Sequence, residues 1–329
     1  MTSYVLGIDG GGTKTQAVIL NQDGVLCGVG MGGPANFDDI GVDAVRENLH
    51  RAVQQARQQA GLDDSPFAAA FLGIAGVVSR TDHAIVSELA ASLQLAPPAQ
   101  VGIDHDCRIA LAGGLSGRPG IVLIAGTGSS CFGVNAQGER WLVGGWGYIM
   151  GDDGSSYWLG CQALRAAVAA YDTRSPETLI RPRLMQALGI SDMNDILHRV
   201  YVEGMSRTQI AALAPIVTQA AREGDAVAIE MIERGASLLA YWIQTVKNKL
   251  AMPNATEVTL VGGLMRAGSI VQDTLSQAIQ QCCPDCIITP PALPSNLGAG
   301  VLALQSLGLD VGHDTRARNL QSAAQALMG

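Results

Sequence analysis

The fold of this chain is decided by the stretch Gly120-Ile-Val-Leu-Ile-Ala-Gly-Thr-Gly-Ser-Ser-Cys-Phe-Gly133. Residues 121–125 are all apolar and mostly β-branched, which predicts a short buried strand. Residues 126–130, which follow, are glycines and hydroxyl residues. Glycine lets backbone N–H groups approach a ligand without an intervening Cβ, and hydroxyl groups add further donors. The sequence therefore predicts an anion-binding turn between two strands.

A second glycine-rich segment follows, Gly144-Gly-Trp-Gly-Tyr-Ile-Met-Gly-Asp-Asp-Gly-Ser-Ser156. It combines an aromatic ring, backbone amides and two adjacent carboxylates, a mixture that suits a ligand with many hydroxyl groups, such as a sugar. One alternative is a hairpin whose glycines serve only tight turns. For Asp152 and Asp153, the alternative is capping of the helix that we expect over residues 157–171.

The plan of the first stretch occurs twice. Residues 4–9 are mainly apolar and precede Gly10-Gly-Gly-Thr-Lys-Thr15, a second strand over residues 16–20, a turn, and a third strand over residues 25–29. Residues 121–143 repeat this order at an offset of 116 residues. Because this offset is far longer than a solenoid period, we expect two related α/β domains, each with one glycine hairpin. Two such hairpins can hold a polyphosphate from both sides.

Composition narrows the function classes. The chain has 329 residues, of which 48% are hydrophobic and 15% charged, enough material for two buried cores. The net charge of −8 and the lack of a basic run argue against a nucleic-acid partner. No basic leader segment opens the sequence, and no apolar run is as long as a membrane span. We therefore expect a cytoplasmic protein without a membrane partner.

The seven cysteines are expected to be reduced thiols, since no export signal is recognisable. Cys283-Pro-Asp-Cys286 is a CxxC pair, but no second pair accompanies it. A zinc or redox role for this pair stays open beside the simpler interpretation of buried thiols. The five histidines lack the spacing of a catalytic zinc site.

Phosphoryl transfer needs a phosphate cradle, a divalent cation and a group that accepts the proton of the nucleophile. Asp9, at the end of the first strand, suits Mg²⁺, which prefers oxygen ligands and keeps much of its water shell. Asp104 or Asp106, after a strand over residues 100–103, suits the proton acceptor. Candidate cradles are the glycine turns, with Gly10, Gly11, Gly12 and Thr13 in the first and Gly126, Thr127 and Gly128 in the second.

Other features refine this picture. Gly262-Gly263 follows a third strand and suits the sugar or α-phosphate of a nucleotide. Two interpretations of Lys14 stay open, contact with phosphate and exposure to solvent. The chain contains neither a P-loop nor a dinucleotide-binding fingerprint at its first strand.

These motifs resemble the N-acetylglucosamine kinase family, within the BadF/BadG/BcrA/BcrD ATPase group of the superfamily of actin, sugar kinases and heat-shock chaperones. The resemblance is carried by Asp9-Gly-Gly-Gly-Thr-Lys14, Gly126-Thr-Gly-Ser129, Gly144-Gly-Trp-Gly147 and Gly151-Asp-Asp-Gly-Ser155, which occur in order over nearly the whole chain. It implies two ribonuclease-H-like domains with a cleft between them. We predict domains at residues 1–117 and 118–313, with residues 314–329 packing back on the first.

The resemblance implies transfer of the γ-phosphate of ATP, with Mg²⁺, to the 6-hydroxyl of N-acetylglucosamine or a related amino sugar such as glucosamine or N-acetylmuramic acid. It makes Asp106, rather than Asp104, the catalytic base. The remaining implied contacts are Thr13, Thr127, Gly262 and Gly263 with ATP, and Asn36, Asp106, Gly145, Trp146, Gly147 and Asp152 with the sugar. His105 stands where the family more often has Asn or Thr. The resemblance also allows a homodimer, which no residue pattern indicates.

Two other functions compete with the kinase. An ATPase that activates a dehydratase or reductase would hold an iron–sulfur cluster between subunits, for which Cys131 and Cys161 are available. That function leaves Trp146 and Asp152 without a purpose. A non-enzymatic actin-like or chaperone module ranks last, because no peptide-binding domain is recognisable.

Overall fold

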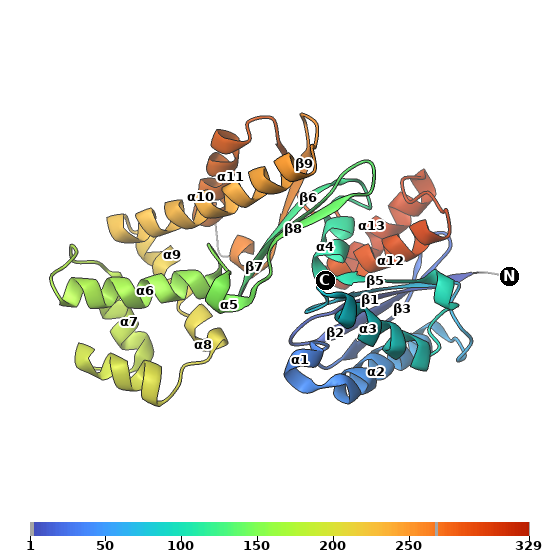
Figure 1. The fold of residues 1–329 in the computed structure, drawn as a ribbon, viewed down its shortest axis with the longest axis horizontal. Helices are drawn as coiled ribbons and strands as arrows, with labels where there is room; N and C mark the ends of the chain where they lie inside the picture. The colour runs from blue at the N-terminus through green and yellow to red at the C-terminus, as the bar shows by residue number, and fades with distance from the viewer. Residues whose placement is uncertain (1–2, 267–268, 329) are drawn as a thin grey trace. The chain divides into compact units, whose positions relative to one another are not determined.

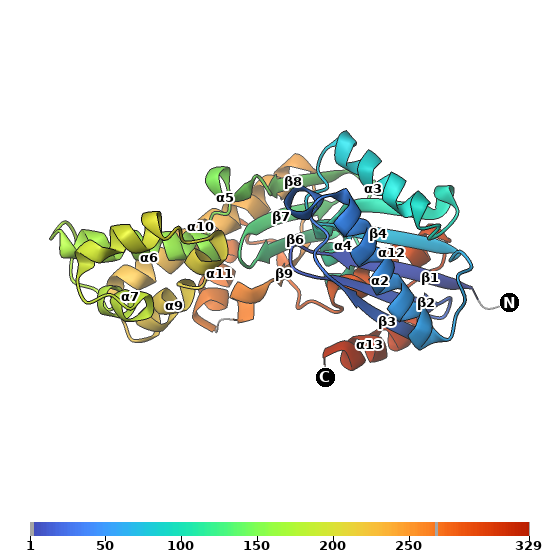
Figure 2. The same cartoon turned by 90° about the horizontal axis from the view of Figure 1, so that it is seen from below.

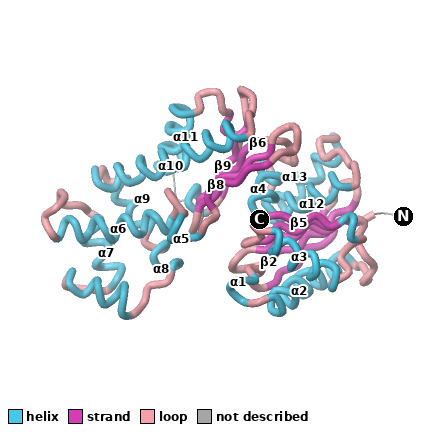
Figure 3. Tube along the Cα trace, in the orientation of Figure 1, coloured by secondary structure: helices cyan, strands magenta, loops and turns pink. Residues whose placement is uncertain are grey.

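The computed structural model describes residues 3–266 and 269–328 and divides the chain into two compact units. The first unit consists of Met1–Pro119 and Thr289–Gly329, and the second is Gly120–Ile288. Each unit contains one five-stranded sheet of mixed strand direction, surrounded by helices (Figure 3). The predicted α/β class is therefore confirmed.

The sheet of the first unit has the strand order β3-β2-β1-β4-β5. Strands β1, β2 and β3 are antiparallel neighbours, whereas β4 and β5 run parallel to β1. The strands are β1 (Tyr4–Gly10), β2 (Thr15–Asn21), β3 (Leu26–Gly32), β4 (Ala69–Ile74) and β5 (Val101–His105). As a result, the ends of β1 and β5 lie at the same edge of the sheet, where parallel sheets commonly place ligands.

Helices cover both faces of this sheet, with α2 on one side and α12 and α13 on the other (Figure 1). Glycines of β3 allow close packing, because a Cβ on Gly30 would lie 1.8 Å from the carbonyl oxygen of Ala52 in α2. The helical elements are α1 (Phe37–Ile40), α2 (Val42–Ala60), α3 (Arg80–Ser92), η1 (Pro98–Gln100), α4 (Asp106–Gly114), α12 (Ser295–Ser306) and α13 (Asp314–Met328).

The sheet of the second unit repeats the same order, β8-β7-β6-β9-β10. Its first three strands are antiparallel neighbours and its last two run parallel to β6, as in the first unit. The strands are β6 (Gly120–Ala125), β7 (Ser129–Val134), β8 (Arg140–Gly144), β9 (Glu257–Val261) and β10 (Ile287–Ile288). The predicted internal duplication is therefore confirmed at the level of strand order.

In the second unit, the long helix α10 packs against the sheet. Helices α6, α7 and α9 lie past the end of that sheet (Figure 2). Asp225 caps α10 by accepting a hydrogen bond from the N–H of Ala228 at 2.9 Å. The helical elements are α5 (Gly147–Met150), α6 (Ser156–Tyr171), α7 (Ile180–Leu188), η2 (Met193–Asp195), the π-helical η3 (His198–Val202), α8 (Arg207–Ala211), α9 (Ala214–Arg222), α10 (Ala226–Lys249), η4 (Gly263–Arg266) and α11 (Ser269–Cys282).

No helix of the two described segments combines the length and the apolar character needed to cross a lipid bilayer.

The two units differ from the predicted domain ranges at α12. We predicted residues 118–313 as the second domain, but α12 packs in the first unit, against β1 and α4. The physical reason is that a glycine of α12 lets this helix pack closely on α4. A Cβ on Gly298 would lie 2.0 Å from the carbonyl oxygen of Ile109 in α4. Helix α13 also packs in the first unit, where the N–H of the Asn319 amide donates to the carbonyl of Asp23 at 2.8 Å. Met1, Thr2, Ala267, Gly268 and Gly329, which belong to the predicted ranges, lie outside the described residues.

Candidate active site

The candidate active-site acids of the first unit lie at the ends of β1 and β5. Asp9 is the penultimate residue of β1, and Asp106 directly follows β5 as the first residue of α4. Burial raises the pKa of Asp9 to about 7, helped by the negative charge of Asp106 and opposed by the positive charge of Lys14. The sheet therefore brings two predicted site residues close enough for their charges to interact.

His105 is paired with Asp106, with 2.6 Å between Nδ1 and Oδ1. The N–H of Cys107 also points at this Nδ1, at 3.2 Å. With a proton, Nδ1 donates to Asp106, and without one it accepts from the N–H of Cys107, so the two contacts belong to different protonation states of His105. Burial lowers the pKa of His105, but the hydrogen bond to Asp106 and the charges of Asp106 and Asp104 outweigh it, so the net pKa lies above its usual value.

The same pair keeps Asp106 ionised. Burial raises the pKa of Asp106, yet the hydrogen bond and charge of His105, together with the groups of Cys107, bring it below its usual value. The position of Asp106 at the start of α4 adds the favourable end of the helix dipole. The pairing with His105 therefore favours the carboxylate form of Asp106.

Asp104, the alternative base, lies deeper in the sheet. It is 8% exposed, against 35% for the side chain of Asp106, and its Oδ1 accepts a hydrogen bond from the backbone N–H of His105 at 2.9 Å. The structure thus places both acids next to His105 but leaves Asp106 more accessible. The role of Asp106 as the base stays a prediction.

The first glycine turn connects β1 to β2. The N–H of Gly11 donates to the carbonyl of Lys14 at 2.9 Å, which closes the turn, and Gly12, Thr13 and Lys14 are exposed. Gly10 has no room for a side chain, because a Cβ would lie 2.4 Å from Ile74 Cδ1. The turn therefore presents exposed backbone and the Thr13 hydroxyl, as an anion cradle requires.

Asn36 caps α1 in the first unit. Its Oδ1 accepts from the N–H of Asp38 at 3.3 Å, and its Nδ2 donates to Asp39 Oδ2 at 2.7 Å. A Cβ on Gly76, just after β4, would lie 2.9 Å from this Oδ1. Asn36 is thus brought to the edge of the sheet where β4 ends, but its predicted contact with a sugar remains a prediction.

The second glycine turn, residues 126–128, connects β6 to β7 and is fixed from behind by α6. The carbonyls of Gly126 and Thr127 accept hydrogen bonds from the N–H groups of Ser156 and Tyr157, at 2.9 and 3.1 Å. The N–H groups of Thr127 and Gly128, in contrast, donate no hydrogen bond to another described residue. These amides are the donors that an anion would use.

The third glycine pair lies beside this turn. Gly262 directly follows β9, the parallel neighbour of β6, with φ of +112°, and a Cβ there would lie 2.3 Å from the carbonyl oxygen of Ala125. A Cβ on Gly126 would lie 3.7 Å from the N of Gly263. Three of the predicted nucleotide contacts, Gly126, Gly262 and Gly263, are therefore neighbours in the structure.

The predicted sugar-contacting segment includes Gly145, Trp146 and Gly147. Gly145 and Gly147 adopt positive φ values of +76° and +74°, which explains why these positions suit glycine. The indole of Trp146 is 65% exposed. The segment is therefore available to a ligand, as an aromatic platform would be.

Asp152, for which we predicted a contact with the sugar, is buried. It is 3% exposed, with φ of +63°, and both of its carboxylate oxygens are engaged. Oδ1 accepts from the N–H of Ser129 at 3.1 Å, and Oδ2 lies 2.6 Å from Nη2 of Arg207. Its contact with a sugar stays a prediction. What the structure shows is its hydrogen bond to Ser129, the first residue of β7.

Arg207 is the residue of this site that the sequence analysis missed. It begins α8, 55 positions from Asp152, and belongs to none of the glycine motifs. The only local signal is the capping box of Ser206 and Gln209, which fixes the start of α8 but says nothing about the direction of Arg207.

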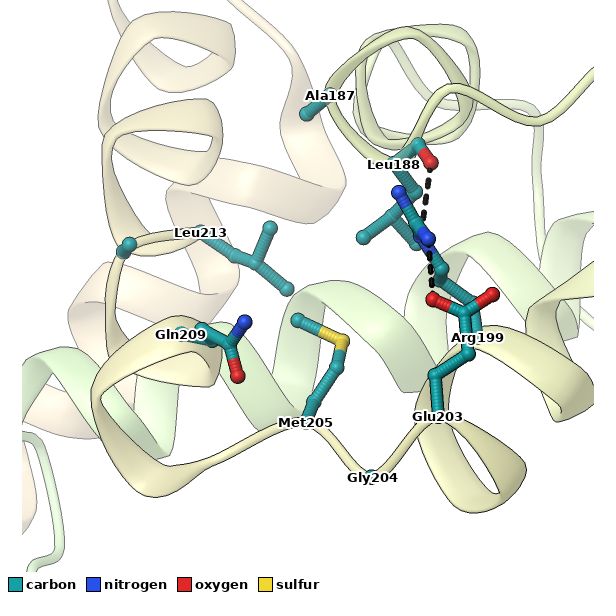
Figure 4. A pocket seen from close by; sticks show the side chains of 9 residues that line it. Ala187, Leu188, Arg199, Glu203, Gly204, Met205, Gln209 and Leu213 are labelled. Carbon is teal, nitrogen blue, oxygen red and sulfur yellow. Dashed lines mark hydrogen bonds and ion pairs between the residues drawn. The ribbon is translucent and has the colours of Figure 1, made fainter.

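A pocket of about 390 Å³ lies elsewhere in the second unit, among α7, η3 and α8 (Figure 4). In it, Arg199 pairs with Glu203 and donates from Nε to the carbonyl of Leu188 at 3.1 Å. None of the predicted site residues lines this pocket, and we assign no role to it.

Two groups of the described residues could hold a cation. Asp9 offers a carboxylate whose neutral form is favoured by burial and, to a smaller extent, by the negative charge of Asp106, and a divalent cation would oppose both effects. His105, Asp106 and Cys107 also place three potential ligand atoms within 4.8 Å of one another. Because the proton-mediated contact between His105 and Asp106 uses two of these atoms, Asp9 fits a cation better.

Comparison with known proteins agrees with this geometry. The chain is 30% identical to an N-acetylmuramic acid/N-acetylglucosamine kinase of Clostridium acetobutylicum, over 91% of this chain and 98% of that protein. It is 29% identical to an N-acetyl-D-glucosamine kinase of Dictyostelium discoideum, over 92% and 98%. A solved structure described as a putative N-acetylglucosamine kinase from Chromobacterium violaceum matches with a TM-score of 0.74 and 28% identity, over 92% of this chain and 99% of that one.

The family model of the BadF/BadG/BcrA/BcrD ATPases matches residues 6–303, which include every predicted site residue of both glycine turns. This match spans both units. The alignments with the two kinases also cover nearly the whole length of those proteins. The chain therefore belongs to the BadF/BadG/BcrA/BcrD ATPase family.

Proposed function

We propose that this protein is an ATP-dependent kinase of amino sugars, which transfers the γ-phosphoryl group of ATP to the 6-hydroxyl of N-acetylglucosamine, N-acetylmuramic acid or a close relative. The observation that carries the proposal is the position of Asp106 at the end of β5, 2.6 Å from Nδ1 of His105, a contact that lowers the pKa of its carboxyl group. Relatives that match nearly the whole chain are named as kinases of these sugars, which supports the substrate class.

In the proposed mechanism, Asp106 accepts a hydrogen bond from the sugar hydroxyl and takes its proton as the oxygen attacks the γ-phosphorus. The bond between the γ-phosphorus and the bridging oxygen breaks, and ADP leaves with its charge. A carboxylate of low pKa suits this step, since in a loose transition state the base mainly orients the nucleophile and receives the proton late. Each glycine turn, taken by itself, offers backbone amides that suit phosphate oxygens.

The first turn provides N–H groups next to the Thr13 hydroxyl, and the second provides those of Thr127 and Gly128. Lys14 is exposed beside the first turn, and its positive charge acts on Asp9. We assign Asp9 to the magnesium that accompanies ATP, where the cation would supply positive charge to the phosphates.

Recognition of the sugar is assigned to Asn36 and to the segment of Gly145, Trp146 and Gly147. The exposed indole of Trp146 offers a flat apolar face, which suits the C–H surface of a pyranose ring. A homodimer and a cytoplasmic location remain predictions.

The competing function, an activator ATPase with an iron–sulfur cluster, is disfavoured by its cysteines. Cys131 is completely buried in the core beneath α10, where burial raises the pKa of its thiol well above the usual range. Cluster ligands must be thiolates. Cys131 therefore cannot reach a subunit surface in this fold without rearrangement of the core.

The test is release of ADP by the purified protein with Mg-ATP, over a panel of amino sugars and a control without sugar. We expect one or a few amino sugars to stimulate release by at least a hundredfold, with the product phosphorylated at the 6-hydroxyl, as NMR would show. Hydrolysis of ATP at one rate with and without sugar would refute the kinase and direct attention to the activator ATPases.

A further inference from the structure

The positive charge at the second glycine turn comes from Arg207. Its guanidinium lies 2.6 Å from Asp152, and its Cζ lies 5.9 Å from the ring centre of Tyr148, close enough for a cation–π contact. A Cβ on Gly128 would lie 2.3 Å from Nη2 of Arg207. The guanidinium thus packs directly on Gly128, where a side chain would displace it.

The position of Arg207 is fixed by the packing of its helix. The capping box of Ser206 and Gln209 sets the first turn of α8. Helix α8 then lies so close to α6 that a Cβ on Gly160 would be 2.0 Å from the carbonyl oxygen of Ile210. Since α6 also binds the carbonyls of Gly126 and Thr127, one helix aligns the loop and the arginine together.

Arg207 retains donors that Asp152 does not use. A guanidinium has five N–H groups, and the hydrogen bond to Asp152 involves Nη2. Nε and Nη1 make no hydrogen bond to another residue within the described segments, and the side chain is 39% exposed. These donors and the N–H groups of Thr127 and Gly128 belong to the same small region of the second unit.

We infer that Arg207 is a phosphate-binding residue, which contacts the polyphosphate of the nucleotide at the turn of residues 126–128. This inference rests on the proposed function for the identity of the ligand as ATP or ADP. Asp152 is its positioning residue, because it holds one edge of the guanidinium and, through the N–H of Ser129, the start of β7. A planar guanidinium with free donors is suited to phosphate oxygens.

The simpler role for Arg207 is that of a counter-ion for the buried carboxylate of Asp152. A counter-ion alone does not need free donors at a solvent-exposed position, nor a glycine beneath it. The two roles also differ in what happens when both charges are removed. A counter-ion becomes dispensable once Asp152 is neutral, whereas a phosphate-binding residue does not.

The experiment measures the Kd of MgADP by calorimetry for the wild type, Arg207→Gln, Arg207→Lys and the double variant Asp152→Asn with Arg207→Gln. We expect Arg207→Gln to weaken binding about tenfold to a hundredfold, the range for a hydrogen bond to a charged group. Arg207→Lys should weaken it less, because the charge remains. The double variant should bind as weakly as Arg207→Gln.

Arg181→Gln is the matched control, since Arg181 forms an exposed ion pair with Glu177 at 3.0 Å in the same unit. It should leave the Kd unchanged. An Arg207→Gln protein that binds MgADP within twofold of the wild type overturns the inference, and so does a double variant that recovers wild-type affinity. If Arg207→Gln fails to fold, the double variant is compared with the wild type, and an affinity within twofold of the wild type overturns the inference.

The test separates this inference from the proposed function. A wild-type protein that binds MgADP but phosphorylates no amino sugar refutes the kinase and leaves the role of Arg207 to be decided by the same Kd values. A wild-type protein that does not bind MgADP refutes both.

Discussion

The Nδ1 atom of His105 lies 2.6 Å from Oδ1 of Asp106, although the two residues are adjacent in sequence. This contact is possible because β5 ends at His105 and α4 begins at Asp106, so the chain turns between them. The imidazole thereby holds the neighbouring carboxylate in one orientation and in its ionised form. A residue at the position before the base can therefore tune that base directly.

Replacing His105 by Asn should move the acid limb of the pH profile. Without the imidazolium, the pKa of Asp106 loses a hydrogen bond and a positive charge that lower it, and burial then raises it. The carboxylate is consequently protonated at a higher pH, so activity is lost earlier as the pH falls. We expect the acid limb of kcat/KM to rise by roughly one pH unit, measured from pH 4 to 8 with the preferred sugar.

His50→Asn is the control for this prediction, because His50 is exposed on α2. Its acid limb should coincide with that of the wild type. An unchanged acid limb in His105→Asn would mean that the pair does not govern the base.

Asp106→Asn should lower kcat by at least a hundredfold, since a general base typically contributes a factor of about 10² to 10⁴. Binding of MgADP should remain, because the predicted nucleotide contacts are other residues. Asp104→Asn is the matched comparison and should cost less activity, as Asp104 is nearly inaccessible. The reverse ranking of the two variants would transfer the role of base to Asp104.

Gly262→Ala should destabilise the protein by about 2 to 4 kcal/mol, because a side chain there is strained by the backbone and collides with Ala125. We expect the melting temperature to fall by roughly 5 to 10 °C. Gly263→Ala is the control, since no atom lies within 4 Å of a Cβ at that position. Equal melting temperatures for the two variants would show that β9 can shift away from β6.

Asp225→Ala should destabilise the second unit by about 1 to 3 kcal/mol at neutral pH. Burial raises the pKa of Asp225, but hydrogen bonds from the N–H groups of Ala228 and Leu179 and from the hydroxyl of Thr178 outweigh it and bring the pKa below 3.8. These bonds connect the start of α10 to the segment before α7.

The pH dependence of this effect follows from the depressed pKa of Asp225. Its contribution is present above the unfolded pKa and is lost as the pH falls through the folded pKa. The difference in unfolding free energy between wild type and Asp225→Ala should therefore be constant from pH 5 to 8 and shrink below pH 4, as urea titrations would show. Asp43→Ala, which removes an exposed ion pair with Arg46, should cost less than 1 kcal/mol at every pH.

Local patterns were sufficient to predict most of the sheet architecture. The strand expected over residues 121–125 corresponds to β6, and the helix expected over residues 157–171 corresponds to α6. Apolar runs, glycine turns and helix caps act within a few residues, so a single sequence contains their signal. The duplication was recognisable because both copies retain the same order of these signals.

Contacts between distant segments could not be predicted in the same way. The range predicted for the second domain, residues 118–313, included α12, and only the packing of Gly298 on α4 shows that this helix covers the first sheet. Arg207 meets Asp152 only because Gly160 lets α8 approach α6. The sequence contains the small residues that permit these contacts but not the identity of their partners.

The division of the first unit between the two ends of the chain has a consequence during synthesis. The face of its sheet that includes Val5 and Leu20 is covered by α12 and α13, which are synthesised after the second unit. About 170 residues of the second unit are made in between, which takes roughly ten to thirty seconds at cellular rates of translation. Throughout that interval this apolar face lacks the helices that cover it, so the core of the first unit is completed only after the second unit has been synthesised.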